Sequence, residues 1–227
     1  IWNCACVTVE DCLIRRGSNK GDGVYCSYST NVMFVRTAFI DNGNSGVGGN
    51  GVYAENSVLL FRNCVIARNY DGICAESSQV TIEGCAIVDH ADSAVLVYGT
   101  GSDLTLLDSY ICWSVQSGIY SGERGSATIK NCRIVNCGLY YSQCGVWLQN
   151  AVSANIVNCT IMDNSTRSGQ AGQFGYGIYA AGTQVSVLNS IVYNNRGGAA
   201  DGAFGTDRGS IIPTSCITSG NPFVTPN

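Results

Sequence analysis

The sequence predicts an all-β fold, a parallel β-helix of about nine coils with three short strands in each coil. Three observations lead to this prediction: a motif that recurs along the chain, period-2 alternation of apolar residues within each copy, and no 3.6-residue period of useful length. A pattern that returns every few tens of residues is typical of a solenoid. An antiparallel sandwich would not need the same pattern in every turn, so stacked parallel coils are favoured.

The recurring motif is most regular in the heptapeptides NCVIARN (63–69), NCRIVNC (131–137) and NCTIMDN (158–164). Each copy has a bend residue, then a small residue in what we call the cysteine slot, then a variable residue and an apolar one. The nine expected slot residues are Cys12, Ala38, Cys64, Cys85, Ser109, Cys132, Cys159, Ser190 and Cys216.

The residue before the slot is Asp, Asn or Gly in seven of the nine copies. These residue types tolerate left-handed backbone geometry, so we expect a sharp bend there and a slot side chain that points into the core. Coils of a β-helix stack ~4.8 Å apart, which would place the slots in a vertical column. We interpret the column as packed free thiols, with disulfides between neighbouring coils, such as Cys64–Cys85, as the alternative.

Two further strands complete each coil. One precedes the bend, as in Val80–Ile82, and the other is a Gly-(Val/Ile)-aromatic segment, as in Gly118–Tyr120. Alternation directs the aromatic residue of the latter outward. The expected outward column is Tyr25, Tyr53, Cys74, Leu96, Tyr120, Trp147, Tyr179 and Phe204.

Composition excludes several classes of function. Charged residues make up 12% of the chain and the net charge is −4, without a run of Lys or Arg, so nucleic acid is not expected as a partner. No apolar stretch nears the ~20 residues of a membrane span. The first residues do not read as a signal peptide. We expect one domain over residues 1–227 with irregular ends at 1–6 and 218–227.

These repeats resemble those of the right-handed parallel β-helix proteins of pectate-lyase type, from Val7 to about Ile217. The resemblance implies a single-stranded right-handed β-helix, and residues 189–227 are similar to the closing coils of secreted bacterial surface proteins. It also implies a fragment of a longer secreted or cell-surface protein, with end-to-end or fused neighbouring domains. Members of this group are polysaccharide lyases, polygalacturonases, alginate epimerases, phage tailspikes and adhesins, so the implied partner is an extracellular polysaccharide.

The outward aromatic residues predict a platform for sugar rings, with stacking between coils as the alternative. The connection that enters the third strand varies most in length, which is typical of a binding rim in solenoids. The expected carbohydrate-binding residues are Tyr25, Tyr53, Trp113, Tyr120, Tyr141, Trp147 and Tyr179.

An acidic group accompanies the same strands. Glu55 and Glu76 occupy equivalent outward positions, Asp71 opens the strand of Glu76, and His90 and Asp92 lie in the next entering loop. Neighbouring carboxylates repel unless a cation or a shared proton intervenes. The sequence therefore offers a calcium site at Glu55, Glu76 and Asp71, or a catalytic group that adds His90 and Asp92. Solvated surface charge is the alternative, since the calcium and arginine pattern of the lyases has no clear match.

Two hypotheses of function remain. One is a glycan-binding or adhesive scaffold; the other is a lyase, hydrolase or uronate epimerase that acts in a groove along the third strands. Among the peripheral cysteines, we expect Cys137 and Cys144 to form a disulfide, with Cys112 as a competing partner, because an oxidising compartment favours short-loop bridges.

Overall fold

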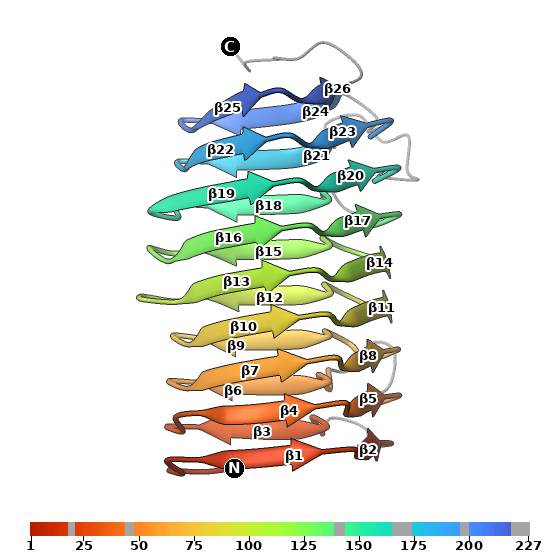
Figure 1. Cartoon of the computed structure of the whole chain (residues 1–227), viewed down its shortest axis with the longest axis vertical. Helices are drawn as coiled ribbons and strands as arrows, with labels where there is room; N and C mark the ends of the chain where they lie inside the picture. The colour runs from red at the N-terminus through yellow and green to blue at the C-terminus, as the bar shows by residue number, and fades with distance from the viewer. Residues whose placement is uncertain (18–20, 44–47, 139–143, 165–173, 196–199, 219–227) are drawn as a thin grey trace.

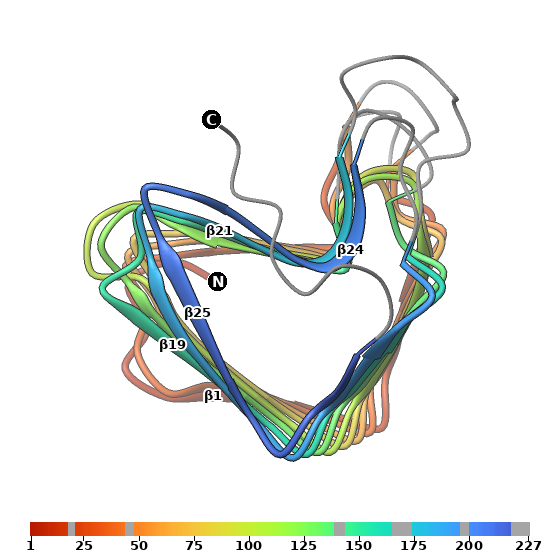
Figure 2. The ribbon, with the colours of Figure 1, turned by 90° about the horizontal axis from the view of Figure 1, so that it is seen from above.

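The computed structural model describes residues 1–17, 21–43, 48–138, 144–164, 174–195 and 200–218. In these ranges the chain forms 26 strands and no helix, stacked as coils along one axis (Figure 1). The strands pair in three parallel sheets that run the length of the stack. Seen from above, the sheets are three walls around a single core (Figure 2). The predicted β-helix is confirmed.

Sheet 1 holds the first strand of each coil, and its nine members pair in chain order. They are β1 (Val7–Glu10), β4 (Val32–Val35), β7 (Val58–Arg62), β10 (Gln79–Glu83), β13 (Asp103–Leu107), β16 (Ser126–Lys130), β19 (Ser153–Val157), β22 (Gln184–Leu188) and β25 (Ser210–Thr214).

Sheet 2 holds the strands that follow the cysteine slot. They are β2 (Leu13–Arg15), β5 (Ala38–Ile40), β8 (Val65–Ala67), β11 (Ala86–His90), β14 (Tyr110–Ser114), β17 (Arg133–Val135), β20 (Thr160–Met162), β23 (Ile191–Tyr193) and β26 (Ile217–Thr218).

Sheet 3 holds the strands with the outward aromatic residues. They are β3 (Val24–Ser27), β6 (Val52–Glu55), β9 (Ile73–Glu76), β12 (Val95–Tyr98), β15 (Ile119–Gly122), β18 (Val146–Gln149), β21 (Phe174–Ala181) and β24 (Ala200–Asp207). The connection that enters this sheet ranges from 91–94 to 163–173, so it varies in length as expected.

The bend before the cysteine slot is left-handed in all nine copies, with φ between 45° and 63°. Cys64, Cys85, Cys132 and Cys159 are buried in the core, which confirms the inward column. In the second copy the expected slot residue is wrong. Ala38 pairs with Val65, the residue after a slot, so Thr37 fills the slot instead. The reason is that the bend falls on an arginine, Arg36, with φ 45°.

The slot side chains form a hydrogen-bonded column rather than mere packing. The Cys64 thiol donates to the Arg62 carbonyl, and the Ser109 hydroxyl donates to the Leu107 carbonyl in the same way. Several slot atoms also accept a backbone N–H from the coil below: Cys85 Sγ accepts from Cys64 N at 3.3 Å, and the Ser109 and Ser190 hydroxyls accept from Cys85 and Cys159. A slot therefore needs a short side chain that both donates and accepts, which Cys, Ser and Thr provide.

The other two corners carry comparable columns. Between sheets 3 and 1, the Ser57 hydroxyl accepts the N–H of Ser29, and Ser78 accepts that of Ser57. Between sheets 2 and 3, the Asn69 side chain accepts the N–H of Asn42 and donates to the Phe39 carbonyl. These bonds satisfy backbone groups that the bends remove from the sheets, where an unpaired buried group would be costly.

Candidate functional site

The outward column of sheet 3 is the candidate binding surface. Tyr25 pairs with Tyr53, and Tyr120 with Trp147 and then Tyr179, as expected. Tyr25 and Tyr53 stack with ring centroids 5.7 Å apart and an angle of 6°. Tyr25 is exposed, whereas the other four rings are half-buried. Stacking between coils therefore accounts for much of this column.

Rings of the C-terminal coils contact each other at steeper angles. The Tyr120 and Trp147 centroids lie 6.2 Å apart at 46°, and those of Trp147 and Tyr179 lie 5.4 Å apart at 76°. Trp147 Nε1 is buried and has no hydrogen-bond partner among the described residues. The neighbouring Gln149 side chain accepts the Tyr120 hydroxyl at 3.1 Å. We call Tyr120, Trp147 and Tyr179 the aromatic face.

The column does not end at Phe204 as expected. Phe204 pairs with the inward Ile178 and is buried in the core, while Gly205 lies opposite Tyr179. The ring of Tyr176 stacks on Tyr179 at 5.7 Å and 9° and covers Gly205, where a Cβ would lie 2.2 Å from it. An aromatic ring thus fills this position from the preceding coil, and the glycine leaves the room for it.

Glu55 and Glu76 are neighbours on sheet 3, in register as predicted. Glu55 accepts hydrogen bonds from the Tyr25 and Ser27 hydroxyls, both at 2.7 Å, and these bonds lower the pKa of its carboxyl. Glu76 accepts the Tyr53 hydroxyl at 3.0 Å and the Tyr98 hydroxyl at 3.3 Å. Each carboxylate therefore anchors tyrosines.

Asp71 and Asp92 lie where neighbouring coils enter sheet 3. Asp71 is only 5% exposed, and its Oδ1 accepts the backbone N–H of Ser93 at 2.8 Å. Burial and the nearby Asp92 charge raise the pKa of Asp71 to about 7. Burial also raises the pKa of Asp92, against a hydrogen bond from the Tyr70 hydroxyl. A carboxyl that holds its proton near neutral pH is a candidate general acid.

His90 belongs to the corner column rather than to this acidic group. It is the last residue of β11 and takes the place that Asn69 occupies in the coil before. Its Nδ1 accepts the Asn69 N–H at 3.3 Å, and its Nε2 faces the Ile66 carbonyl at 3.2 Å, which fits a neutral ring protonated at Nε2. Burial lowers the pKa of His90 to about 4. The histidine is a structural replacement for asparagine, so its candidacy as a catalytic base has no geometric support.

The two expected rim residues have different outcomes. Trp113 lies inside β14 of sheet 2, not in the entering loop, and is 52% exposed. It occupies the same corner position as Asp89 in the coil before, beside His90, which pairs with Ser114. Tyr141 lies outside the described residues, so its expected role stays a prediction.

The described part of the chain contains no group of three or more His, Cys, Asp or Glu side chains that could hold a metal ion such as calcium. Glu55 and Glu76 accept hydrogen bonds from tyrosine hydroxyls, and Asp71 accepts a hydrogen bond from a backbone N–H. One oxygen of each carboxylate is therefore engaged by a hydrogen-bond donor, namely Glu55 Oε1, Glu76 Oε2 and Asp71 Oδ1, and the expected calcium site stays a prediction.

All thirteen cysteines are free thiols in the structure, in contrast to the expected Cys137–Cys144 bridge. The two residues belong to different corner positions. Cys137 continues the asparagine column, where its N–H donates to Asn164 Oδ1 at 2.9 Å, and its thiol donates to the Val135 carbonyl. Cys144 precedes Gly145, at the entry to sheet 3, and is also buried. Burial raises the pKa of both thiols to about 12, so neither is reactive as a thiolate.

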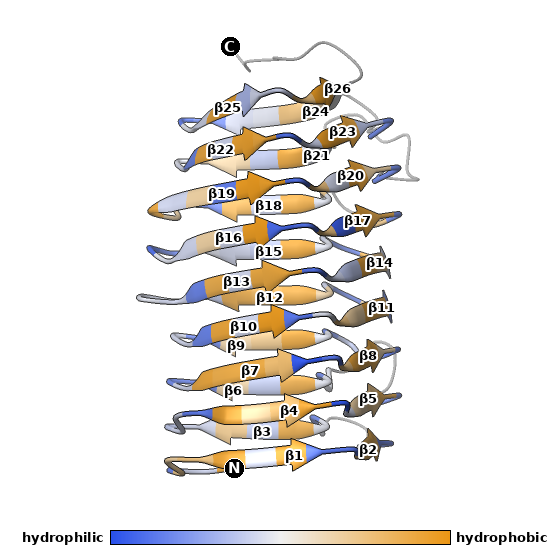
Figure 3. Cartoon of the chain, viewed as in Figure 1, coloured by the Kyte–Doolittle hydropathy of each residue, from blue (hydrophilic) through white to orange (hydrophobic). Residues whose placement is uncertain are grey.

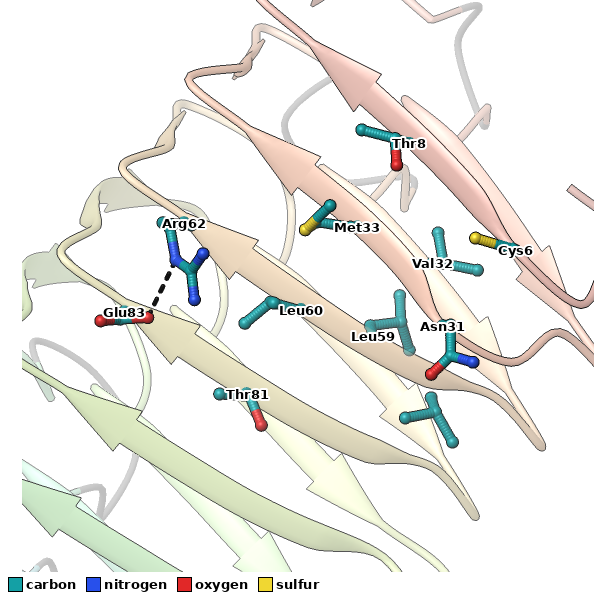
Figure 4. A pocket seen from close by; sticks show the side chains of 11 residues that line it. Cys6, Thr8, Asn31, Val32, Met33, Leu59, Leu60, Arg62, Thr81 and Glu83 are labelled. Carbon is teal, nitrogen blue, oxygen red and sulfur yellow. Dashed lines mark hydrogen bonds and ion pairs between the residues drawn. The ribbon is translucent and has the colours of Figure 1, made fainter.

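The described residues also line several hollows that the sequence does not reveal, and two of these lie in the N-terminal and central coils. The larger, of about 460 Å³, lies on the outer face of sheet 1 over β1, β4, β7 and β10. Met33 and Leu60 lie side by side in it, and the ion pair of Arg62 and Glu83 is at one end (Figure 4). Figure 3 shows that β4 and β7 are apolar over most of their length, while β16 and β19 are more polar.

The smaller hollow, of about 250 Å³, lies at the corner of sheets 2 and 3 in the central coils. Arg68, Tyr70, Asp89 and His90 are among the residues that line it. Arg68 is held by Asp41 at 2.7 Å, and Asn69 is a further polar residue of the lining.

Comparisons with known proteins agree with this architecture. No curated protein sequence matches the chain. The structure resembles that of pectate lyase Pel9A, with 14% identity, a TM-score of 0.52 and coverage of 83% of this chain and 54% of that one. It also resembles the Dettilon tailspike protein, with 11% identity, a TM-score of 0.53 and coverage of 94% and 56%. PfbA, a surface adhesin of Streptococcus pneumoniae, aligns with 10% identity, a TM-score of 0.34 and coverage of 95% and 61%.

The chain therefore spans a little more than half the length of the pectate lyase and of the tailspike. None of its described segments is a helix long and apolar enough to cross a membrane. The family model for the right-handed β-helix region matches residues 1–111 and again residues 105–225. Because these matches cover nearly the whole sequence, the chain belongs to the right-handed β-helix family.

Proposed function

We propose that this chain is a secreted or cell-surface β-helix module that binds an extended polysaccharide along the aromatic face of sheet 3. The observation that carries the proposal is Trp147. Its ring lies half-buried between Tyr120 and Tyr179, and its indole N–H has no acceptor among the described residues. A buried donor without a partner is costly, and a ligand that packs on the partly exposed ring would satisfy the N–H with a hydroxyl once the neighbouring rings shift to uncover it.

The spacing of the face suits a glycan. Neighbouring coils lie ~4.8 Å apart, so two coils span ~10 Å, which is close to a disaccharide repeat. The C–H faces of sugar rings pack on aromatic rings, and the Gln149 amide beside Tyr120 offers polar partners for hydroxyls. Such a polymer would run parallel to the axis of the β-helix, across the strands.

Charge narrows the class of glycan. In sequence, the strands of sheet 3 carry Glu55, Glu76, Asp201 and Asp207 and contain no Lys or Arg. A polyuronate would meet repulsion on this face, because like charges raise the free energy of the complex. A neutral polysaccharide is therefore the favoured ligand.

The test is a titration of the wild-type chain and of Trp147→Ala with neutral and acidic polysaccharides. Removal of the ring should weaken binding of a neutral polymer at least several-fold, about 1–2 kcal/mol, because one aromatic contact and one donor are lost. Trp2→Ala is the matched control, since Trp2 is exposed in the first coil, away from the aromatic face. Equal affinity of Trp147→Ala and wild type, or no binding by wild type, would contradict the proposal.

A second candidate, a glycan-cleaving enzyme, rests on Asp71. Its pKa of about 7 and its neighbour Asp92 are features of an acid/base pair. Asp71 is nearly inaccessible, which favours a structural role instead. Product analysis of polysaccharide digests decides the question: turnover that Asp71→Asn and Asp92→Asn abolish supports an enzyme, and binding without products supports the module.

A further inference from the structure

The cysteine slots contain two isolated pairs of thiols. Cys64 and Cys85 occupy consecutive coils, and so do Cys132 and Cys159. Thr37, Ser109 and Ser190 fill the slots that flank the pairs. Each of the four cysteines therefore has one thiol neighbour in the column and no second one.

The geometry of each pair suits a bond between the two sulfurs. Cys64 and Cys85 precede residues that pair directly, Val65 and Ala86, and the Cys64 N–H donates to Cys85 Sγ at 3.3 Å. The Cys85 side chain is also the largest influence on the pKa of Cys64, which it lowers, as expected for two neighbouring thiols. Adjacent strands place such Cα atoms ~4.8 Å apart, within the range of ~4.4–6.8 Å that disulfides span.

The second pair repeats this arrangement. Cys132 and Cys159 precede the paired residues Arg133 and Thr160, and the Cys159 side chain is the largest cause of the raised pKa of Cys132. Both side chains point into the core, as do those of the first pair. By contrast, Cys137 and Cys144 occupy different corner columns and face different neighbours.

We propose that Cys64–Cys85 and Cys132–Cys159 are redox sites that close into two vertical disulfides when the chain folds in the presence of a disulfide oxidant. In each site two thiols lose two protons and two electrons as the S–S bond forms. The oxidant, a small disulfide, accepts them and leaves as two thiols. The four thiols are only 1–3% exposed, so the exchange takes place before the coils close. Each bond then ties one coil to the next from inside.

The experiment compares refolding with mixed oxidised and reduced glutathione to refolding with excess dithiothreitol. Peptide mapping by mass spectrometry without reduction should find the Cys64–Cys85 and Cys132–Cys159 cross-links in the oxidised sample. Its Tm should exceed that of the reduced sample by several degrees, because each disulfide restricts the unfolded chain. Recovery of all four residues as alkylated thiols after oxidative refolding would overturn the proposal.

The chain itself suggests the control substitution. Ser109 and Ser190 already fill slots and make the same hydrogen bonds, so a serine should be tolerated at either pair. Cys64→Ser should lose the first cross-link and keep the second. The double variant Cys64→Ser, Cys159→Ser should lose both, together with the redox-dependent shift in Tm. A shift of wild-type size in the double variant would assign the effect to other cysteines and refute the proposal.

Discussion

The central coils, from β6 to β14, and the C-terminal coils, from β17 to β23, share one backbone plan but differ on two surfaces. In the corner column, the coils of β11 and β14 have His90 and Ser114, whereas those of β20 and β23 have Asn164 and Asn195. Asn69 and Cys137 fill the column in the coils of β8 and β17. On sheet 3, the central coils place Cys74 and Leu96 in the outward column, whereas the C-terminal coils place Trp147 and Tyr179 there.

The difference separates requirements of the fold from features available for function. His90, Asn164 and Asn195 each accept an N–H of the coil below and face a carbonyl, so histidine and asparagine fill the corner in the same way, whereas the Ser114 hydroxyl has no partner among the described residues. The outward column has no such requirement. Central rings such as Tyr53 are tied to carboxylates through their hydroxyls, while Trp147 keeps a free donor among the described residues. Binding is therefore expected in the C-terminal coils and anchoring in the central ones.

The largest expected effect is in the C-terminal corner. Asn164→Leu removes the acceptor for the Cys137 N–H and the donor to the Ile134 carbonyl, both in the core. Each buried group left without a partner costs about 1–3 kcal/mol, so we expect a loss of about 3 kcal/mol or more. Urea denaturation monitored by circular dichroism measures it.

Asn155→Ala serves as the control for that substitution, because Asn155 is exposed on sheet 1 in the same region of the stack. It should change the free energy of unfolding by less than about 0.5 kcal/mol. If Asn164→Leu were as mild as Asn155→Ala, the corner column would not be a requirement of the fold, and the comparison between the two regions would lose its basis.

The central corner should respond to pH, which the asparagine corner cannot do. The pKa of His90 is about 4 in the folded chain and 6.5 in the unfolded one. The unfolded state therefore binds a proton first, and stability present above pH 6.5 is lost as the pH falls toward 4. The expected loss is about 2–3 kcal/mol. Protonation would give Nδ1 a hydrogen that faces the Asn69 N–H.

His90→Asn should remove this acid sensitivity and remain folded, since asparagine fills the same column elsewhere. Asp71 acts in the opposite direction. Its folded pKa of about 7 exceeds 3.8, so its contribution is present below pH 3.8 and lost as the pH rises through 7. The quantity to measure at each pH is the difference in the free energy of unfolding between wild type and His90→Asn. Both proteins contain Asp71, Asp92, Asp89 and Arg68, so the contributions of these groups cancel in the difference. A difference that stays constant from pH 7 to pH 4 would contradict the assignment.

The sequence predicted all three strands of each coil and the inward cysteines, because alternation and the bend residue are local signals. It misplaced Ala38 because the bend there uses Arg36, a residue type that seldom adopts left-handed geometry. It misplaced Phe204 because the ring that covers Gly205 comes from Tyr176 in another coil. When one coil supplies the ring that fills a position in the next coil, the sequence of a single repeat carries no signal of it.

The asparagine column has a sequence signal that the prediction missed. Asn69 and Asn164 end the heptapeptides NCVIARN and NCTIMDN, five residues after the slot, and Cys137 and His90 have the same offset. A regular offset with mixed residue types would have identified His90 as structural. The hydrogen-bond partners of Glu55 and Glu76 were harder to predict from the sequence. The neighbour of an outward residue depends on the register between coils, and the coils are joined by loops of different length.

The smallest expected effect is at Tyr53 in the central part of sheet 3. Tyr53→Phe keeps the ring and removes one hydroxyl, whose bond to Glu76 spans 3.0 Å. The Tyr98 hydroxyl still donates to Glu76, so the loss should be about 0.5–1 kcal/mol of stability. Binding of a neutral polysaccharide should not change, because the central rings serve as anchors. Calorimetric titration of Tyr53→Phe and of Trp147→Ala with the same neutral polysaccharide compares the contributions of the two regions to affinity. If Tyr53→Phe weakened binding as much as Trp147→Ala, the glycan would reach the central coils, and the division between anchoring and binding rings would be wrong.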